Sequence, residues 1–447
     1  MDFIDVKGPL LLYVYKVASQ LAPGSVVGLY VLYSLAVAST LFFSFRTARV
    51  FLGEVPRAVL AAVLLLPFLY WYRIYCNGGQ SEELMAPMFA CLIYAWVRYL
   101  NYSGGVRFLA CSIGAGLAAT MLIKYNCAFV FGVSFWLLVG ELAVHRCWKR
   151  LLVGVLPWAV GSFVVVFAPF VLYLVCAGIL EACWRVYVEL NFATYFGGSG
   201  SAGAVGMLTK VLTWVDKLVR GPEGLAGTLC LIGACWYSVR VYGVGWKSCM
   251  LAAVAAAGFV SCLGVFPYYW LFYMPCGILL TTMVMAGMRP GIGTRTVAAV
   301  VLLTMYAGVR VNDQWASRAP RRVTQKLPSA LAAVESAVCS REHPRLLYLG
   351  MLDKGFGVRA GALPACPEWC TLNGVDETFM ERQREAVRQR KADFVIVMSV
   401  PLWVSPEDRD EQESWRDRLC KENGYARVCS YTESGYAVCT LYEKVGE

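Results

Sequence analysis

Charge is scarce in this 447-residue chain, and histidine is almost absent. Charged residues make up 16% of the sequence, hydrophobic residues make up 58%, and there are two histidines. Average soluble domains carry about 25% charged and roughly 45–50% apolar residues. With a mean hydropathy of +0.56, the composition predicts an α-helical polytopic membrane protein rather than a soluble one.

Several signatures of other protein classes are missing as well. The chain has no Walker phosphate loop, no Gly-x-Ser-x-Gly turn and no His-Glu-x-x-His motif. It begins without the basic and apolar regions of a signal peptide. None of its 18 cysteines forms a Cys-x-x-Cys pair, so a zinc site is not expected. Disulfide pairing stays open for the six C-terminal cysteines, which are Cys339, Cys366, Cys370, Cys420, Cys429 and Cys439.

The net charge of +10 does not predict a nucleic-acid partner, because many of the basic residues lie in short loops between apolar runs. These loops fall on one side of the membrane, and the positive-inside rule makes that side the cytoplasm. Basic loops at such a surface also favour anionic membrane lipids. The outer side then carries residues 1–20, 75–83, about 178–222 and everything after 312.

The apolar runs predict about ten membrane spans, at roughly 17–25 residues per span. We expect a membrane domain over residues 1–311 and a small extracytoplasmic α/β domain over residues 312–447, where the composition becomes that of a soluble protein. The approximate span cores are 26–43, 57–74, 84–98, 108–123, 126–144, 152–176, 224–241, 248–265, 269–288 and 296–311.

The C-terminal domain shows strand and helix patterns in alternation. Residues 345–350 and 393–398 are apolar runs typical of strands, and residues 377–391 between them have helical character. The last apolar segments predict a hairpin around Glu433-Ser-Gly435.

Two acidic motifs fall on the outer side. In Asp5-Val-Lys7-Gly-Pro9 the carboxylate could orient a partner or bind a metal, and the lysine suits a phosphate. An interfacial flank with a snorkelling lysine explains the same residues. Glu82 and Glu83 could face an outer cavity shared with Asp5. Alternatively, they simply lie at the N-terminus of the following helix, where the helix dipole favours negative charge.

Two further motifs lie on the same side. Lys124-Tyr125-Asn126 sits between two apolar runs, and its lysine could bind an anionic headgroup or snorkel to the interface. Tyr268 and Tyr269 are typical of an interfacial aromatic belt, and they could equally line a groove for a lipid tail or a sugar. The convergence of four motifs on one membrane face indicates a site there.

In order and sidedness these motifs resemble polytopic glycosyltransferases of the GT-C class, with the protein O-mannosyltransferase and aminoarabinose-transferase families as the nearest comparison. Those families carry an acid-x-Lys-x-Pro motif before a span, which matches Asp5-Val-Lys7-Gly-Pro9. A Thr-Glu-like pair before a later span matches Ser81-Glu82, and a lysine after a glycine-rich helix matches Lys124. The similarity covers roughly residues 1–310.

The resemblance implies a transferase in a bacterial inner membrane, which moves a sugar from a polyprenyl-phosphate carrier to an acceptor that the sequence does not identify. It implies that Lys7, with Lys124, holds the carrier phosphate. Asp5 and Glu82 would orient the acceptor or a divalent metal ion, which is the one cofactor that the motifs admit. The remaining substrate-binding candidates are Glu83, Tyr125, Asn126, Tyr268 and Tyr269.

The same resemblance raises a question about the start of the chain. In such families the catalytic base is an acidic residue of the first outer loop, and the Asp-x-Lys-x-Pro motif comes later. Asp5 belongs to the later motif, so we do not assign it as the base. We therefore expect Met1 to be internal to a longer protein; a genuine truncation or a degenerate copy would explain the same start.

Two alternatives to the enzyme stay open. A transporter or flippase of lipid-linked substrates would typically show internal repeats and charges at mid-membrane. The sequence shows no repeat, and its charges cluster at the outer face, which favours the enzyme. A catalytically incomplete scaffold, whose membrane part only anchors the outer domain, is the second alternative.

Overall fold

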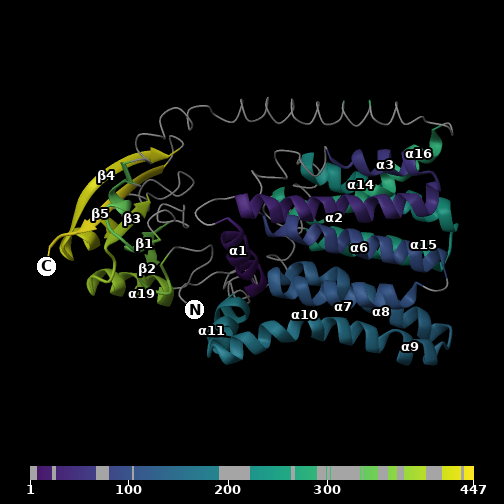
Figure 1. Cartoon of the computed structure of the whole chain (residues 1–447), viewed down its shortest axis with the longest axis horizontal. Coiled ribbons are helices and arrows are strands. Elements are labelled where there is room, and N and C mark those ends of the chain that lie inside the picture. The colour runs from purple at the N-terminus through teal and green to yellow at the C-terminus, as the bar shows by residue number, and fades with distance from the viewer. Residues whose placement is uncertain are drawn as a thin grey trace, which may run out of the picture. The chain divides into compact units, whose positions relative to one another are not determined.

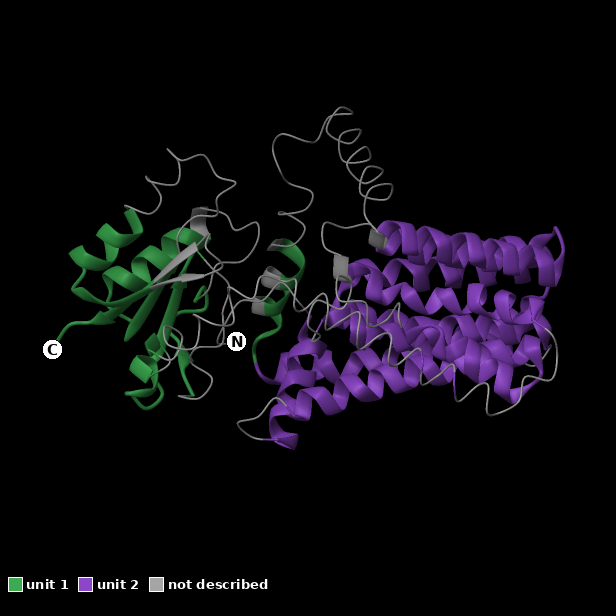
Figure 2. Ribbon diagram, turned by 90° about the horizontal axis from the view of Figure 1, so that it is seen from above, with its two compact units in different colours: residues 1–6, 178–199, 317–447 green, residues 7–177, 200–316 purple. Residues whose placement is uncertain are grey.

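Figure 1 shows the computed structural model of the chain. Two compact units are present (Figure 2): residues 7–177 and 200–316 form a helical unit, and residues 1–6, 178–199 and 317–447 form a second unit. The structure describes residues 8–22, 27–66, 80–102, 105–190, 222–262, 267–288, 299, 303, 333–334, 336–350, 361–369, 377–398, 415–433 and 437–446.

The helical unit consists of α-helices and short 3-10 turns (Figure 1). Its 3-10 turns are η1 (Tyr125–Cys127), η3 (Pro267–Phe272) and η4 (Met274–Cys276). Its helices are α1 (Pro9–Leu21), α2 (Val27–Leu52), α3 (Val55–Val63), α6 (Ser81–Asn101), α7 (Val106–Ile123), α8 (Ala128–Val144), α9 (Trp148–Gly154), α10 (Leu156–Cys176), α14 (Pro222–Tyr242), α15 (Trp246–Ser261) and α16 (Gly277–Gly287).

The predicted integral membrane character is confirmed. By length and hydropathy, five described segments could cross a membrane: Val27–Leu52, Val106–Ile123, Tyr125–Val144, Trp148–Cys176 and Gly224–Tyr242. The helix predicted over 108–123 is α7. The predicted last span, 296–311, and the boundary predicted at residue 312 lie outside the described residues, apart from the isolated positions 299 and 303.

Proline positions help to set where several helices begin. α1, α3 and α10 each have a proline within their first two residues: Pro9, Pro56 and Pro157. A proline there loses no helical hydrogen bond, because the first N–H groups of a helix have no partner within it. The Gly8-Pro9 pair thereby fixes the start of α1.

Helix α6 runs through the core of the helical unit. It packs against α2, α7 and η3, and Phe89 and Trp96 are fully buried. The Phe89 ring stacks on the Phe272 ring at 5.0 Å between centroids, which connects α6 to η3. Glu82 and Glu83 lie at one end of α6 and Arg98 at the other, so the helix links two charged ends of the unit.

Close packing around α7 depends on glycines. A Cβ atom on Gly114 would lie 2.0 Å from the Ala159 carbonyl oxygen of α10. A Cβ atom on Gly116 would lie 2.1 Å from the Phe131 ring of α8. Small residues allow helices to approach closely where no hydrophobic effect drives them together, and this approach positions the C-terminal end of α7.

The second unit contains a five-stranded mixed sheet with strand order β2-β1-β3-β5-β4. β1 pairs in parallel with β2 and β3, and β5 pairs antiparallel with β3 and β4. Its strands are β1 (Arg345–Leu349), β2 (Leu363–Pro364), β3 (Phe394–Met398), β4 (Tyr425–Glu433) and β5 (Ala437–Lys444), and its described helical segments include α11 (Leu180–Trp184), the π-helix η2 (Arg185–Leu190) and α19 (Glu377–Arg388).

The elements predicted in this unit are confirmed: two parallel strands, the helix between them and the C-terminal pair of strands. Leu347, Val395 and Tyr442 form part of its core. Cys339, Cys420 and Cys429 carry free thiols. Burial raises the pKa of the Cys420 thiol to about 12, which suits a small apolar role in the core.

Candidate active site

Three elements of the helical unit bring Glu82, Lys124 and Tyr269 together. Glu82 is the second residue of α6, Lys124 directly follows the last residue of α7, and Tyr269 belongs to η3. The Lys124 backbone is extended, with φ −161°, so the chain leaves the helix at this residue. This ends α7 directly before Tyr125 begins η1.

Glu82 and Lys124 form a buried ion pair. The Glu82 side chain is 1% exposed and the Lys124 side chain is 21% exposed. The Lys124 ammonium donates a hydrogen bond to Glu82 Oε1, and the Ser81 hydroxyl donates one of 2.8 Å to Glu82 Oε2. Both carboxylate oxygens therefore have a donor, which is the condition under which a buried charge is tolerated.

The Tyr269 ring covers one face of the Lys124 ammonium. The Lys124 Nζ atom lies 3.4 Å from the centroid of the Tyr269 ring, a close cation–π contact. An ammonium group has three N–H donors, and one of them serves Glu82. The cation is therefore held in place by Glu82 and Tyr269.

Gly8 connects the Asp-x-Lys-x-Pro motif to this site. The Gly8 N–H donates to the Ile123 carbonyl at 3.0 Å, one residue before Lys124. A Cβ atom on Gly8 would lie 2.0 Å from the Leu122 carbonyl oxygen, so only glycine fits this contact. The motif therefore meets the chain beside Lys124, although Asp5 and Lys7 themselves lie outside the described residues.

Glu83 adds a second carboxylate, and one buried tyrosine lies within electrostatic range of it. Glu83 is 5% exposed and lies in the first turn of α6. The buried Tyr33 side chain of α2 is within electrostatic range of Glu82 and Glu83, and it also interacts with Tyr15 of α1. The sequence analysis missed both tyrosines, because each lies within an apolar run that contains other aromatic residues.

The other predicted residues lie around the same end of the unit. The Asn126 amide donates to the Ser261 carbonyl at 3.4 Å, which connects η1 to α15. Its Oδ1 atom is buried and has no hydrogen-bond partner among the described residues. Tyr125 is half-buried in η1. The Tyr268 side chain lies outside the described part of the structure.

The described residues contain no group of three or more metal-ligating side chains. Glu82 is already engaged by Ser81 and Lys124. The site as described is therefore a fixed cation beside two buried carboxylates, with aromatic side chains around it. Such an arrangement suits a phosphate that approaches the lysine and a hydroxyl that approaches a carboxylate.

The whole chain resembles solved membrane proteins in its fold. ArnT from Cupriavidus metallidurans in the apo state matches with a TM-score of 0.59 at 15% identity, over 98% of this chain and 88% of ArnT. The same ArnT bound to undecaprenyl phosphate matches with a TM-score of 0.54 at 15% identity, over 97% and 87%. The chain has the GT-C fold.

This fold confirms the predicted architecture, namely a helical membrane part followed by a small C-terminal α/β domain. A further match is the archaeal oligosaccharyltransferase AglB from Archaeoglobus fulgidus, solved in complex with an inhibitory peptide and a dolichol-phosphate. The match covers 99% of this chain and 66% of the AglB chain. This match has a TM-score of 0.44 at 13% identity. No family model and no curated protein matches the sequence.

Proposed function

We propose that the chain is a membrane glycosyltransferase, which moves a sugar from a polyprenyl-phosphate carrier to an acceptor at the outer face of the membrane. The observation that carries this proposal is the buried Glu82–Lys124 pair beside Gly8 of the Asp-x-Lys-x-Pro motif. It is supported by the GT-C fold that the chain shares with ArnT, which was solved with undecaprenyl phosphate.

In this proposal the carrier phosphate binds to Lys124 and Lys7. A charge-assisted hydrogen bond from an ammonium to a phosphate oxygen is roughly twice as strong as a neutral one. Glu82 and Asp5 orient the acceptor, with Glu83, Tyr125 and Asn126 nearby. Tyr268 and Tyr269 line the donor side, where aromatic rings suit a sugar or an isoprenoid.

The chemical step is a substitution at the anomeric carbon. The acceptor hydroxyl oxygen forms a bond to this carbon, and the bond from the carbon to the phosphate oxygen breaks. The carrier phosphate leaves with the electron pair and stays on the lysines, which stabilise its charge. The hydroxyl proton passes to a general base. This base is a carboxylate other than Asp5 and Glu82, which orient the acceptor.

The proposal includes a location. The positive-inside rule puts the basic ends of α2, α6 and α14, at Arg49, Arg98 and Arg240, at the cytoplasm of a bacterial inner membrane. The site at the start of α6 then faces outward, as does the C-terminal α/β domain.

Lys124→Ala is the first test. The purified full chain is reconstituted in vesicles with a panel of radiolabelled undecaprenyl-phosphate-linked hexoses and pentoses, and released undecaprenyl phosphate is measured. We expect the variant to lose activity by at least about 100-fold, the usual effect of removing a group that stabilises transition-state charge. Lys247→Ala is the matched control, because Lys247 binds the Leu100 carbonyl at the other end of α6.

Full turnover by Lys124→Ala would overturn the assignment of this site. Movement of an intact lipid-linked sugar across the vesicle membrane, without release of undecaprenyl phosphate, would favour the transporter or flippase instead. A folded wild-type protein that binds undecaprenyl phosphate but neither transfers nor moves the sugar would favour the scaffold.

A further inference from the structure

A second cationic site lies at the other end of α6. A cavity of about 500 Å³ is lined by Arg46, Arg49, Val50, Tyr94, Arg98, Tyr102 and Gly105. Arg98 follows Glu82 by 16 residues on α6, which is about 24 Å along a helix at 1.5 Å per residue. The cavity is therefore separate from the Glu82–Lys124 site.

Aromatic side chains position two of the three arginines of this cavity. The Arg46 guanidinium donates to the Tyr94 hydroxyl at 3.1 Å and lies 5.5 Å from the Tyr94 ring centroid. It also lies 6.0 Å from the Phe42 ring centroid. The Arg98 guanidinium lies 5.5 Å from the Phe108 ring centroid. Stacking on rings fixes a guanidinium plane while its N–H edge stays available.

No carboxylate in the described part of the chain forms an ion pair with Arg46, Arg49 or Arg98. Orientation by the positive-inside rule explains why basic residues lie at this end, but it does not require them to line one cavity. Three cations that share a cavity repel one another, and a bound anion relieves this repulsion.

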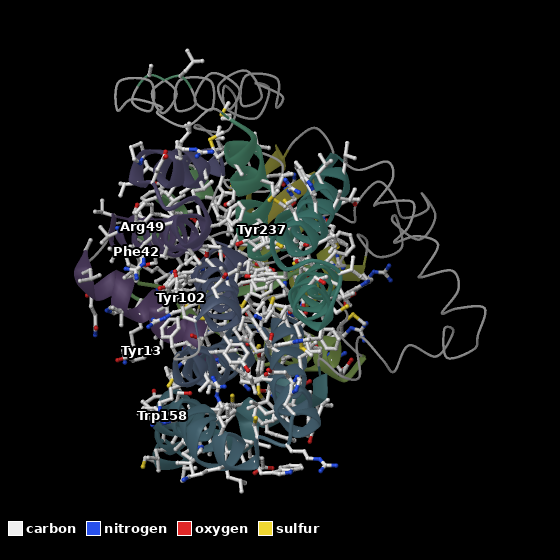
Figure 3. All side chains as sticks on the ribbon, turned by 90° about the vertical axis from the view of Figure 1, so that its right-hand side faces the viewer. Tyr13, Phe42, Arg49, Tyr102, Trp158 and Tyr237 are labelled. Carbon is white, nitrogen blue, oxygen red and sulfur yellow. The ribbon has the colours of Figure 1, made fainter. Side chains whose placement is uncertain are left out.

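An exposed apolar surface leads to the same cavity. Val31, Leu35 and Phe42 of α2 are 46%, 58% and 52% exposed, and they follow one another at spacings of four and seven residues. These spacings place them on one side of the helix, and Arg46 follows one turn after Phe42. Viewed along the bundle, Phe42, Arg49 and Tyr102 lie on the same flank (Figure 3).

We propose that this cavity binds the phosphate headgroup of an anionic membrane phospholipid, whose acyl chain lies along the Val31–Phe42 surface of α2. Arginine forks match phosphate oxygens in pairs. Basic pockets between membrane helices are sites at which anionic headgroups bind. The exposed apolar surface favours a lipid over a free phosphate.

A neighbouring cavity provides a matched comparison. It measures about 470 Å³ and is lined in part by Arg107, Arg146, Lys149 and Arg150. Its walls come from the first residues of α7 and from the segment around α9, so it shares the same end of the unit without α2. Substitutions here remove the same number of charges without touching the proposed lipid site.

The test compares two triple variants of the full chain in detergent micelles. One carries Arg46→Gln, Arg49→Gln and Arg98→Gln; the control carries Arg107→Gln, Arg146→Gln and Lys149→Gln. Native mass spectrometry measures the affinity for phosphatidylglycerol and for phosphatidylcholine. We expect wild type to prefer phosphatidylglycerol at least about tenfold, the first triple variant to lose this preference, and the control to keep it within about twofold.

Several outcomes would overturn the proposal. Equal loss in both triple variants would mean that net surface charge, not this cavity, attracts the lipid. Displacement of phosphatidylglycerol by an equal concentration of inorganic phosphate would mean that the site takes a small anion. If the triple variant folds poorly, the single variant Arg49→Gln replaces it, because Arg49 is exposed and its substitution should not disturb folding. An Arg49→Gln variant that binds phosphatidylglycerol as tightly as wild type would contradict the proposal.

Discussion

The two ends of the helical unit hold positive charge in opposite ways. At one end Lys124 is fixed between the Glu82 carboxylate and the Tyr269 ring. At the other end Arg46, Arg49 and Arg98 line a cavity, and no described carboxylate pairs with them. A buried pair is costly to break, whereas partly exposed arginines without a counter-ion can take their anion from outside the protein.

Breaking the buried pair gives the largest expected effect. Lys124→Met leaves the Glu82 carboxylate, which is 1% exposed, without its cation. We expect the free energy of unfolding to fall by about 3–5 kcal/mol, the usual cost of an uncompensated buried charge. The double variant Glu82→Gln/Lys124→Met should recover most of this loss and still lack transfer activity.

Unfolding of the purified full chain, followed by circular dichroism, measures these changes. Arg49→Met is the control from the other end, and its unfolding free energy should stay within about 0.5 kcal/mol of wild type. A Lys124→Met variant as stable as Arg49→Met would show that the two ends do not differ in this way.

Gly8→Ala should have an effect of intermediate size on the stability of the helical unit. The new Cβ atom would lie 2.0 Å from the Leu122 carbonyl, so the start of α1 must move away from α7. Overpacking of this kind costs about 1–3 kcal/mol, and transfer should fall because the Asp-x-Lys-x-Pro motif no longer meets Lys124. Gly132→Ala is the control, because nothing lies within 4 Å of its added Cβ atom. Equal turnover in both variants would contradict a role for this contact.

The smallest effect is expected from an exposed ion pair in the second unit. Hydrogen bonds from Arg388 and then Arg384 lower the pKa of Glu381, which lies at the surface. Any stability that this carboxylate adds is present above its unfolded pKa of about 4.3 and is lost as the pH falls through its folded pKa. Glu381→Gln should therefore change the melting temperature at pH 7 very little, and less still at pH 3. A larger difference at pH 3 than at pH 7 would contradict this sign.

The sequence was informative where a polar residue interrupts an apolar run. Glu82 and Lys124 each stand out on that ground, and the structure brings their side chains into contact. The strands and the helix of the second unit could also be predicted from the sequence, because the spacing of their apolar residues differs clearly from that of the membrane helices. Whether these residues act on a substrate stays a prediction.

Tertiary contacts without a local signature could not be predicted. Tyr33 lies within electrostatic range of Glu82 and Glu83 because α2 packs on α6, and nothing in its neighbourhood in the sequence distinguishes it from Tyr30. The arginine cavity was hidden for a different reason. Membrane orientation already accounted for Arg46, Arg49 and Arg98 one by one, and only the fold shows that they share one cavity.

The length of α6 has a consequence for the membrane around the protein. A helix of 21 residues is about 31 Å long, close to the roughly 30 Å thickness of a bilayer's hydrocarbon core. Glu82 and Arg98 lie 16 residues apart, about 24 Å along α6, so a bilayer with a thicker hydrocarbon core must deform around the unit if both charges are to reach its surfaces. The acyl-chain length of the host lipid thereby becomes a variable that acts on both ionic sites through one helix.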